Sequence, residues 1–217
     1  MTMPGFYFCI CPDYELAREH MQQHLLSQIP LGKPRVIWGD EGLDETFWNT
    51  LNQMNLGGVF KILVVRHAEM LPAEQWKLLS QSLAVPHADA LPVFFLEMQW
   101  EKGKPKIPGH IAKLKCLEFA EKMQWIWSYS GLARDSLRKY IKREINRNHL
   151  DVADDILDYL CETVSPDAAA IKTFGQQLAL AAEDGKVTWD IVRAIPACGN
   201  EADVFDMIKN IEHGKLR

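Results

Sequence analysis

Residues 63–71 read "LVVRHAEML". An apolar run is followed by a short polar tetrad and then by a second apolar pair, which is typical of a buried strand that ends at a site. In a strand that serves nucleotide hydrolysis, two carboxylates follow the apolar run, because Mg²⁺ and the attacking water need them there. Arg66 and His67 occupy these two positions here. The sequence therefore predicts a strand that keeps its shape without that chemistry.

Strands and helices alternate on both sides of this stretch. Asp13 is placed to cap the first helix, and Pro72 stands in the first turn of the third. Alternation through residue 119 predicts a parallel sheet with helices on both faces, an α/β fold. The expected strands are residues 5–11, 34–38, 60–65, 91–98 and 113–119, and the expected helices between them are residues 13–29, 43–54 and 72–85.

The pattern changes from about residue 123 onward, where only helical periodicity is present. The expected helices are residues 130–148, 150–162, 166–182 and 188–195. We therefore expect three parts: an α/β domain at residues 1–127, a small all-helical domain at residues 128–200, and the start of a further domain at residues 201–217.

Composition is that of an ordinary globular protein: 217 residues, 47% hydrophobic and 24% charged. No apolar run approaches the roughly 20 residues of a membrane helix, and the N-terminus lacks the pattern of a signal peptide. The five cysteines are an odd, scattered set, and Cys9 and Cys11 alternate within the first strand as buried thiols do. A cytoplasmic protein with reduced thiols and no membrane contact is expected.

Charge is distributed unevenly along the chain. Residues 101–150 hold 12 Lys/Arg and 5 Asp/Glu, a net charge of +7, so the remaining residues carry −12 of the total of −5. Such a basic segment either faces nucleic acid or an acidic partner, or forms ordinary solvated helix faces.

The phosphate site of a P-loop protein can be checked position by position. The first strand of such a protein leads into G-x-x-x-x-G-K-[ST], whose N–H groups and lysine hold the phosphates. Here it leads into Cys11, Pro12 and Asp13, with no glycine, lysine or magnesium-binding hydroxyl in the turn. Pro12 lacks an N–H donor, and Asp13 would repel a phosphate. Since the acidic pair is also replaced, by Arg66 and His67, neither nucleotide hydrolysis nor a cofactor is expected.

Two other groups of residues have side chains that occur in binding sites. His20 and His24 stand four apart on the first helix, as zinc ligands do, but no third ligand is evident and the interpretation as surface histidines is preferred. Trp125 and Trp127 have the chemistry to stack on bases, although tryptophans at a domain junction usually serve packing. No metal site is expected.

The order of these segments resembles the delta subunit of the bacterial DNA polymerase III clamp loader. The resemblance is carried by "PDYELARE", "VIWGD", "KILVVRHAEML", "LAVPHADALPVFFLE" and "KLKCLEF", and in the helical half by "VTWDIV" and "VFDMI". It covers nearly all 217 residues and rests on order and hydrophobic pattern. It implies an AAA+ fold without a working nucleotide site, followed by a helical lid. The segment from residue 201 resembles the opening of the family's C-terminal collar domain.

The resemblance implies a mechanical role without intrinsic enzymatic activity. The delta subunit binds the ring-shaped sliding clamp and helps to open it, as part of an assembly with other clamp-loader subunits, the polymerase and primer–template DNA. Its clamp contact comes from a turn before the third strand, in which a few apolar side chains supply most of the affinity. Leu56 matches the first apolar residue of that turn, whereas Gly57 replaces the aromatic one. Val59 or Phe60 would supply the missing anchor, unless Phe60 only begins the buried strand.

Two alternatives remain open on the sequence alone. One is an ATP-dependent AAA+ enzyme with a degenerate phosphate loop, for which Gly103-Lys104 is the only candidate and lacks a following Ser/Thr. The other is a DNA-binding module that uses the basic segment at residues 101–150.

Overall fold

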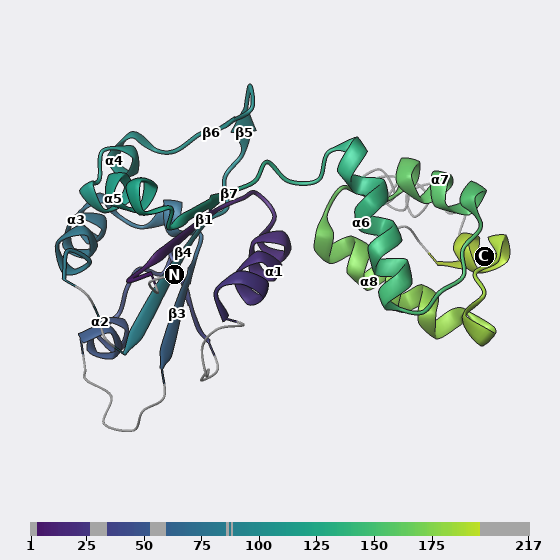
Figure 1. The fold of residues 1–217 in the computed structure, drawn as a ribbon, viewed down its shortest axis with the longest axis horizontal. Coiled ribbons are helices and arrows are strands. Elements are labelled where there is room, and N and C mark those ends of the chain that lie inside the picture. The colour runs from purple at the N-terminus through teal and green to yellow at the C-terminus, as the bar shows by residue number, and fades with distance from the viewer. Residues whose placement is uncertain (1–3, 27–33, 53–59, 86, 88, 196–217) are drawn as a thin grey trace, which may run out of the picture. The chain divides into compact units, whose positions relative to one another are not determined.

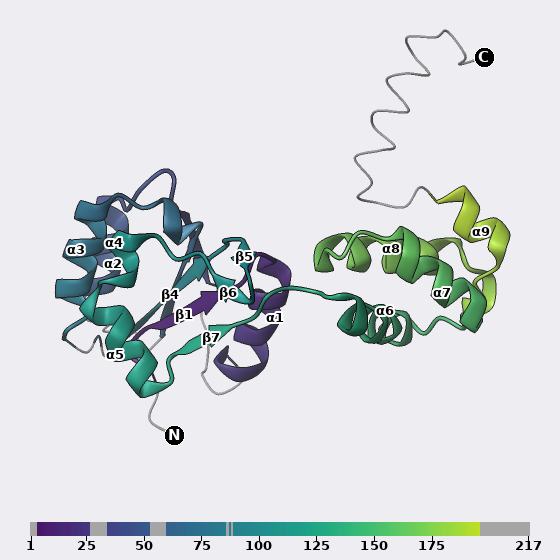
Figure 2. The same ribbon diagram turned by 90° about the horizontal axis from the view of Figure 1, so that it is seen from above.

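The computed structural model describes residues 4–26, 34–52, 60–85, 87 and 89–195. The chain divides into two compact units, Met1–Ser130 and Gly131–Arg217 (Figures 1 and 2). Within the described residues, no helix combines the length and the apolar character that crossing a membrane requires.

The first unit is built on a five-stranded sheet in which all neighbouring strands are parallel. The spatial order is β2-β3-β4-β1-β7, so β1 lies between β4 and β7 although it comes first in the chain. Residues Ile37, Val65, Phe94 and Phe8 stand in register across four strands. The strands are β1 (Tyr7–Ile10), β2 (Arg35–Trp38), β3 (Lys61–Arg66), β4 (Ala90–Leu96) and β7 (Ile126–Ser128).

Helices cover both faces of this sheet. Helix α1 (Tyr14–His24) lies on one face, whereas α2 (Glu45–Asn52), α3 (Ala73–Ser82), α4 (Gly109–Ala112) and α5 (Lys115–Met123) lie on the other (Figures 1 and 2). Because side chains alternate between the faces of a strand, every second residue of β1, β3 and β4 packs into the core beneath α2–α5. That core includes the fully buried side chains of Phe8, Leu63, Trp76 and Phe94.

The predicted α/β fold is confirmed, and so is the α1 cap, because the Asp13 carboxylate accepts hydrogen bonds from the first turn of the helix. The predicted fifth strand at residues 113–119 is wrong. That segment begins helix α5, whose buried residues Cys116, Leu117 and Ala120 follow helical spacing. The fifth strand of this sheet is β7, which is only three residues long. It begins two residues after Gln124, which ends helix α5 in a left-handed conformation.

A two-stranded antiparallel hairpin follows β4 in the chain. Its strands are β5 (Trp100–Glu101) and β6 (Lys104–Pro105), and its turn residues Lys102 and Gly103 both have positive φ angles. Such a two-residue turn fits the right-handed twist of a hairpin.

The second unit is helical in its described residues. The apolar faces of α6, α7 and α8 pack together, with Leu137, Ile141, Leu160, Ile171 and Phe174 among the buried residues. The α-helices are α6 (Arg134–Arg147), α7 (Asp154–Thr163), α8 (Ala168–Ala181) and α9 (Trp189–Ala194), with a short 3-10 turn at Glu183–Gly185. Residues 201–217, the expected start of a further domain, lie outside the described residues.

Candidate functional site

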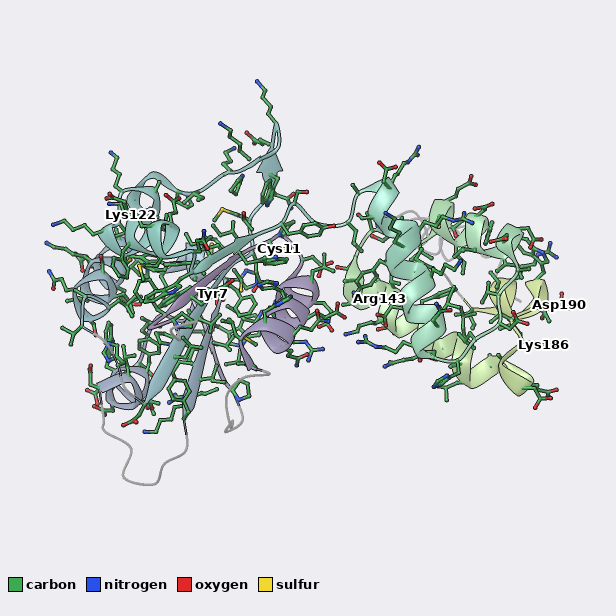
Figure 3. The ribbon with its side chains drawn as sticks, in the orientation of Figure 1. Tyr7, Cys11, Lys122, Arg143, Lys186 and Asp190 are labelled. Atoms are coloured by element: carbon green, nitrogen blue, oxygen red, sulfur yellow. The ribbon has the colours of Figure 1, made fainter. Side chains whose placement is uncertain are left out.

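The carboxyl ends of the parallel strands are where ligands bind in open α/β folds. The turn from β1 into α1 lies at this edge and contains Cys11, Pro12 and Asp13; Figure 3 labels Cys11. The Asp13 carboxylate accepts hydrogen bonds from the backbone N–H groups of Glu15 (2.9 Å) and Leu16 (3.2 Å). These are donors that a phosphate would need at a helix N-terminus. The N–H groups at the start of α1 are therefore already bonded to the carboxylate of the N-cap residue, Asp13.

An ion pair lies at the same edge. Arg66, the last residue of β3, donates two hydrogen bonds to the carboxylate of Glu97, which directly follows β4, at 2.8 Å from Nε and 2.6 Å from Nη2. The Glu97 side chain is only 6% exposed and that of Arg66 20% exposed. A parallel two-bond contact of this kind is the strongest geometry available to arginine and a carboxylate. The hydrogen bonds that Arg66 donates to the Glu97 carboxylate raise the pKa of its guanidinium.

Aromatic rings hold the guanidinium in place. Its central carbon lies 3.7 Å from the centre of the Tyr14 ring and 4.6 Å from that of Trp38, so the cation is stacked as well as paired. Tyr14 is the first residue of α1, and its ring also contacts Phe95 at 5.1 Å between centroids. Arg66 thus links the end of β3 to Glu97 after β4 and to the first residue of α1 at this edge.

The backbone after β3 is fixed to the backbone after β4. The backbone N–H of His67 donates to Glu97 at 3.3 Å, and the Glu69 carboxylate accepts the backbone N–H of Glu97 at 3.0 Å. His67 adopts a left-handed conformation with φ of 46°, which is uncommon outside glycine. Gly39 approaches the carbonyl of His67 so closely that a Cβ at that position would lie 2.2 Å from its oxygen.

The five residues predicted at the nucleotide position, Cys11, Pro12, Asp13, Arg66 and His67, therefore lie at one edge of the sheet. Burial raises the pKa of the Cys11 thiol to about 12, so this thiol is not a reactive nucleophile.

Two further residues at this edge, Glu97 and Tyr14, were not predicted from the sequence. Glu97 sits at the end of a strand that reads as uniformly apolar, and Tyr14 reads as an ordinary first-turn residue. The unpaired arginine at the end of β3 was the available signal, because a partly buried cation requires a carboxylate partner.

Of the predicted clamp-contact residues, only Phe60 is among the described residues, and it lies at the opposite, amino-terminal edge of the sheet. Phe60 directly precedes β3, is half-buried, and lines a cavity at that edge. Leu56 and Val59 lie outside the described residues.

The rings of the two histidines of α1 lie 4.6 Å apart between centroids, but they are not both on the surface. His20 is half-buried and stacks on the Trp127 ring at 4.4 Å between centroids with an interplanar angle of 11°, whereas His24 is exposed. The Tyr7 hydroxyl lies 3.3 Å from Nε2 of His20. Burial, with a smaller contribution from His24, lowers the pKa of His20 to about 4. Within the described residues, no group of three or more potential ligands is arranged to hold a metal ion.

The basic segment at residues 101–150 is divided between the two units. Lysines of the β5–β6 hairpin and of α5 belong to the first unit, and the basic residues of α6 belong to the second. Lys139, Lys142 and Arg143 are exposed at positions three and four apart on α6; Figure 3 labels Arg143.

No family model and no curated protein matches the sequence. Solved structures do match. The DNA clamp loader delta protein of Bacillus subtilis is 12% identical, with 98% of this chain and 64% of that chain covered and a TM-score of 0.49. Domain III of the replication initiation protein DnaA of Thermotoga maritima is 13% identical over 87% and 82% of the two chains, with a TM-score of 0.48. The RuvB Holliday junction branch migration motor of the same organism is 11% identical over 87% and 60%, with a TM-score of 0.53.

At this identity the likeness to RuvB establishes the fold alone. The chain has an AAA+-type architecture: a parallel α/β unit of the P-loop class followed by a helical region. It spans less than two thirds of the length of RuvB and of the clamp loader delta protein.

Proposed function

We propose that this chain is a non-catalytic clamp-loader subunit of the replicative DNA polymerase III holoenzyme, which binds the sliding clamp and helps to open it for loading onto primed DNA. The observation that carries the proposal is the filled carboxyl edge. An AAA+ fold whose phosphate donors are capped by Asp13, and whose Arg66 is held by Glu97, serves as a mechanical or binding part. The resemblance of the sequence to the clamp-loader delta family supports that assignment.

In this proposal the amino-terminal edge contacts the clamp. Leu56, Val59 and Phe60 are the proposed anchors, which insert into an apolar pocket of the ring. A few exposed apolar side chains then supply most of the affinity. ATP hydrolysis is left to other clamp-loader subunits in the assembly.

The alternative of an ATP-dependent enzyme is not favoured. Gly103 and Lys104, the only candidate phosphate loop in the sequence, form part of the β5–β6 hairpin rather than a strand-to-helix turn. Without a helix N-terminus behind it, such a turn does not provide converging N–H donors for a phosphate.

A contact with primer–template DNA is the second part of the proposal. Lys139, Lys142 and Arg143 lie exposed along α6, and a basic helix face of this kind suits the phosphate backbone. Replacing Lys139 and Lys142 together by glutamine is expected to weaken binding to any primed duplex and to reduce the steepness of its salt dependence by about 2. A salt dependence unchanged from wild type would remove α6 from the DNA contact.

The clamp contact is tested by surface binding of the full chain to the sliding clamp of its own organism. Wild type is compared with Leu56→Ala, Val59→Ala and Phe60→Ala, and with Leu78→Ala as a control for an exposed leucine on α3. Truncating a true anchor should weaken binding by roughly thirtyfold, about 2 kcal/mol. A folded wild-type chain that does not bind the clamp would reject the proposal.

A further inference from the structure

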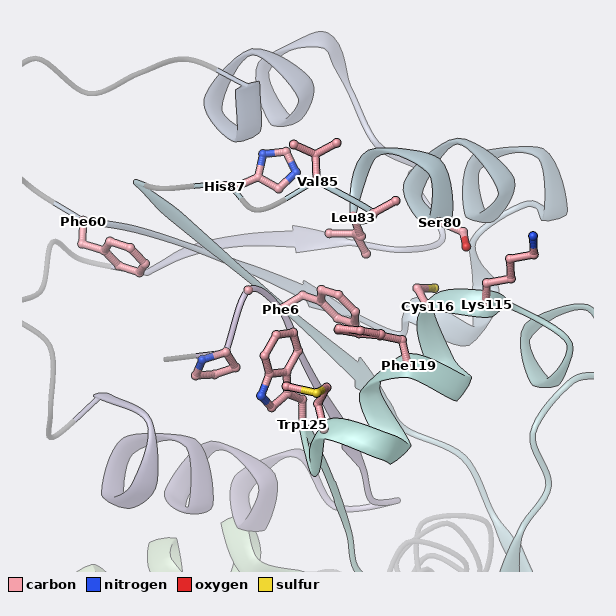
Figure 4. Close-up of a pocket in the computed structure, with 14 residues that line it drawn as sticks. Phe6, Phe60, Ser80, Leu83, Val85, His87, Lys115, Cys116, Phe119 and Trp125 are labelled. Carbon is pink, nitrogen blue, oxygen red and sulfur yellow. The ribbon is translucent and has the colours of Figure 1, made fainter. Parts of the chain in front are cut away.

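A cavity of about 650 Å³ opens at the amino-terminal edge of the first unit (Figure 4). It lies on the face of the sheet covered by α3 and α5, and residues preceding β1, β3 and β7 line it together with the end of α3. Its volume is in the range of known ligand pockets, about 300–1,000 Å³. It is at the opposite edge of the sheet from Arg66 and Glu97, so it is separate from the filled nucleotide position.

Aromatic rings in mutual contact form one wall of the cavity. The rings of Phe6 and Trp125 meet edge to face at 5.4 Å between centroids, and so do those of Phe119 and Trp125 at 5.4 Å. Contacts of this geometry fix the ring orientations. The cavity is therefore formed in the free protein and needs no rearrangement of these rings to accept an apolar group.

Apolar side chains at the mouth are exposed to solvent. Val85 is 64% exposed, Phe119 47% and Met123 43%. Contiguous exposed apolar surface around a cavity marks a binding site more often than a scattered single residue does.

The charge at the mouth has one sign. Among the described residues that line the cavity, Lys115 is the only Lys or Arg, and no carboxylate is present. The Glu118 carboxylate, one turn further along α5, is not part of the lining and accepts a hydrogen bond from the Lys122 ammonium at 2.7 Å. The lining therefore complements an apolar group that carries a negative charge.

The lining runs along one side of α5, as the contact surface of an extended peptide would. Lys115, Phe119 and Met123 stand at four-residue intervals on α5, so they line one side of the helix. Eight residues of helix span about 12 Å, the length of roughly three to four extended peptide residues.

We propose that this cavity is the docking site for an acidic peptide segment of a partner protein. The segment inserts a bulky apolar side chain between Phe119, Trp125 and Val85 and places a carboxylate at the Lys115 ammonium. This site goes beyond the proposed clamp-loader function and does not depend on it, since the peptide chemistry is the same whichever protein carries the segment.

The test uses fluorescein-labelled tetrapeptides and the full chain, with binding followed by fluorescence anisotropy. The acidic apolar probe Glu-Leu-Phe-Glu should bind saturably, whereas Lys-Leu-Phe-Lys and Glu-Ser-Ser-Glu should bind at least about tenfold more weakly, since each lacks one of the two required features. Lys115→Glu should reverse the preference between the acidic and the basic probe, and Val85→Asp should remove binding of the acidic one. Both positions are exposed, so the variants keep the fold.

Matched controls separate the cavity from general surface effects. Lys122→Glu changes the same charge on the same helix, and Leu78→Asp changes an exposed apolar residue of α3 outside the cavity. Both should bind the acidic probe as wild type does.

Four outcomes would overturn the proposal. The first two are that wild type binds no probe, or that it binds the three probes equally. The third is that Lys122→Glu and Lys115→Glu lose the same amount of affinity for the acidic probe, and the fourth is that the chain forms a dimer which Val85→Asp abolishes while no probe binds. The last outcome would assign the cavity to a second copy of this chain. Failure of clamp binding affects none of these readouts, so the two proposals fail independently.

Discussion

Replacing Glu97 by glutamine tests whether the carboxyl edge is closed by a true buried ion pair. Glu97→Gln keeps the size of the side chain, but it removes the negative charge and turns an amide NH₂ group toward the Arg66 donors. The two bonds at 2.8 and 2.6 Å and the 6% exposure of Glu97 show that the carboxylate of this pair is buried. Hydrogen bonds to charged groups contribute about 1.5–3 kcal/mol, and breaking a buried pair costs about 3–5 kcal/mol.

Because the Arg66 side chain retains 20% exposure, water relieves part of this cost, and we expect a loss of about 2–3 kcal/mol in the free energy of unfolding. The assay is urea unfolding followed by tryptophan fluorescence, which reports mainly on the first unit because six of the seven tryptophans precede residue 131. With a typical urea slope of about 2 kcal/mol/M, the midpoint should fall by roughly 1–1.5 M.

The control is Glu101→Gln, since Glu101 bonds to Lys106 at 2.9 Å with both side chains largely exposed. That exposed pair should leave the midpoint unchanged. The double variant Arg66→Met/Glu97→Gln should recover most of the loss, because methionine still packs on Tyr14 and Trp38 and leaves no uncompensated charge. A midpoint shift for Glu97→Gln no larger than that for Glu101→Gln would refute the reasoning.

Three further predictions concern the elements that support this edge. Asp13→Ala should cost about 1 kcal/mol in urea unfolding through loss of the α1 cap, whereas Asp13→Asn should cost less. Gly39→Ala should cost about 1–3 kcal/mol, because the new methyl group would overlap the His67 carbonyl; a stability equal to wild type would show that the backbone shifts freely. The lowered pKa of His20 means that only the unfolded chain binds this proton between about pH 6.5 and about pH 4, so stability should fall as the pH falls through that window. Unfolding at pH 7.5 and pH 5.0 should show a smaller pH difference for His20→Phe than for wild type, and equal differences would contradict the buried position.

The sequence predicted the alternating strands and helices of the first unit as far as β4, because long apolar runs and a clear cap leave little ambiguity. It failed at residues 113–119, where seven residues are too few to separate a period of 2 from one of 3.6. Extending the window to Ala120 and Met123 reveals the helical period. The three-residue β7 carries no pattern of its own, and its place is set by pairing with β1.

The position of the candidate site was predicted from the phosphate-binding and acidic residues that the sequence lacks there. The absent glycine, lysine and acidic pair identified the position of Arg66 and His67, but the partner of Arg66 was not predicted because Glu97 is distant in sequence and joins the edge only through strand pairing. The cavity beside Phe60 could not be predicted from the sequence either, because it combines the ends of several strands with exposed residues of α5. The hydrophobic pattern alone predicts that Phe119 and Met123 are core residues, whereas both are exposed.

Equilibrium binding of a fluorescent ATP analogue with Mg²⁺ to the full chain tests the central claim most directly. If Asp13 caps the helix and Arg66 stays paired with Glu97, no saturable binding should appear up to about 1 mM nucleotide, a level that corresponds to about −4 kcal/mol. Saturable micromolar binding that Arg66→Ala or Asp13→Ala changes would contradict the account, because the nucleotide would then occupy the edge that these side chains fill.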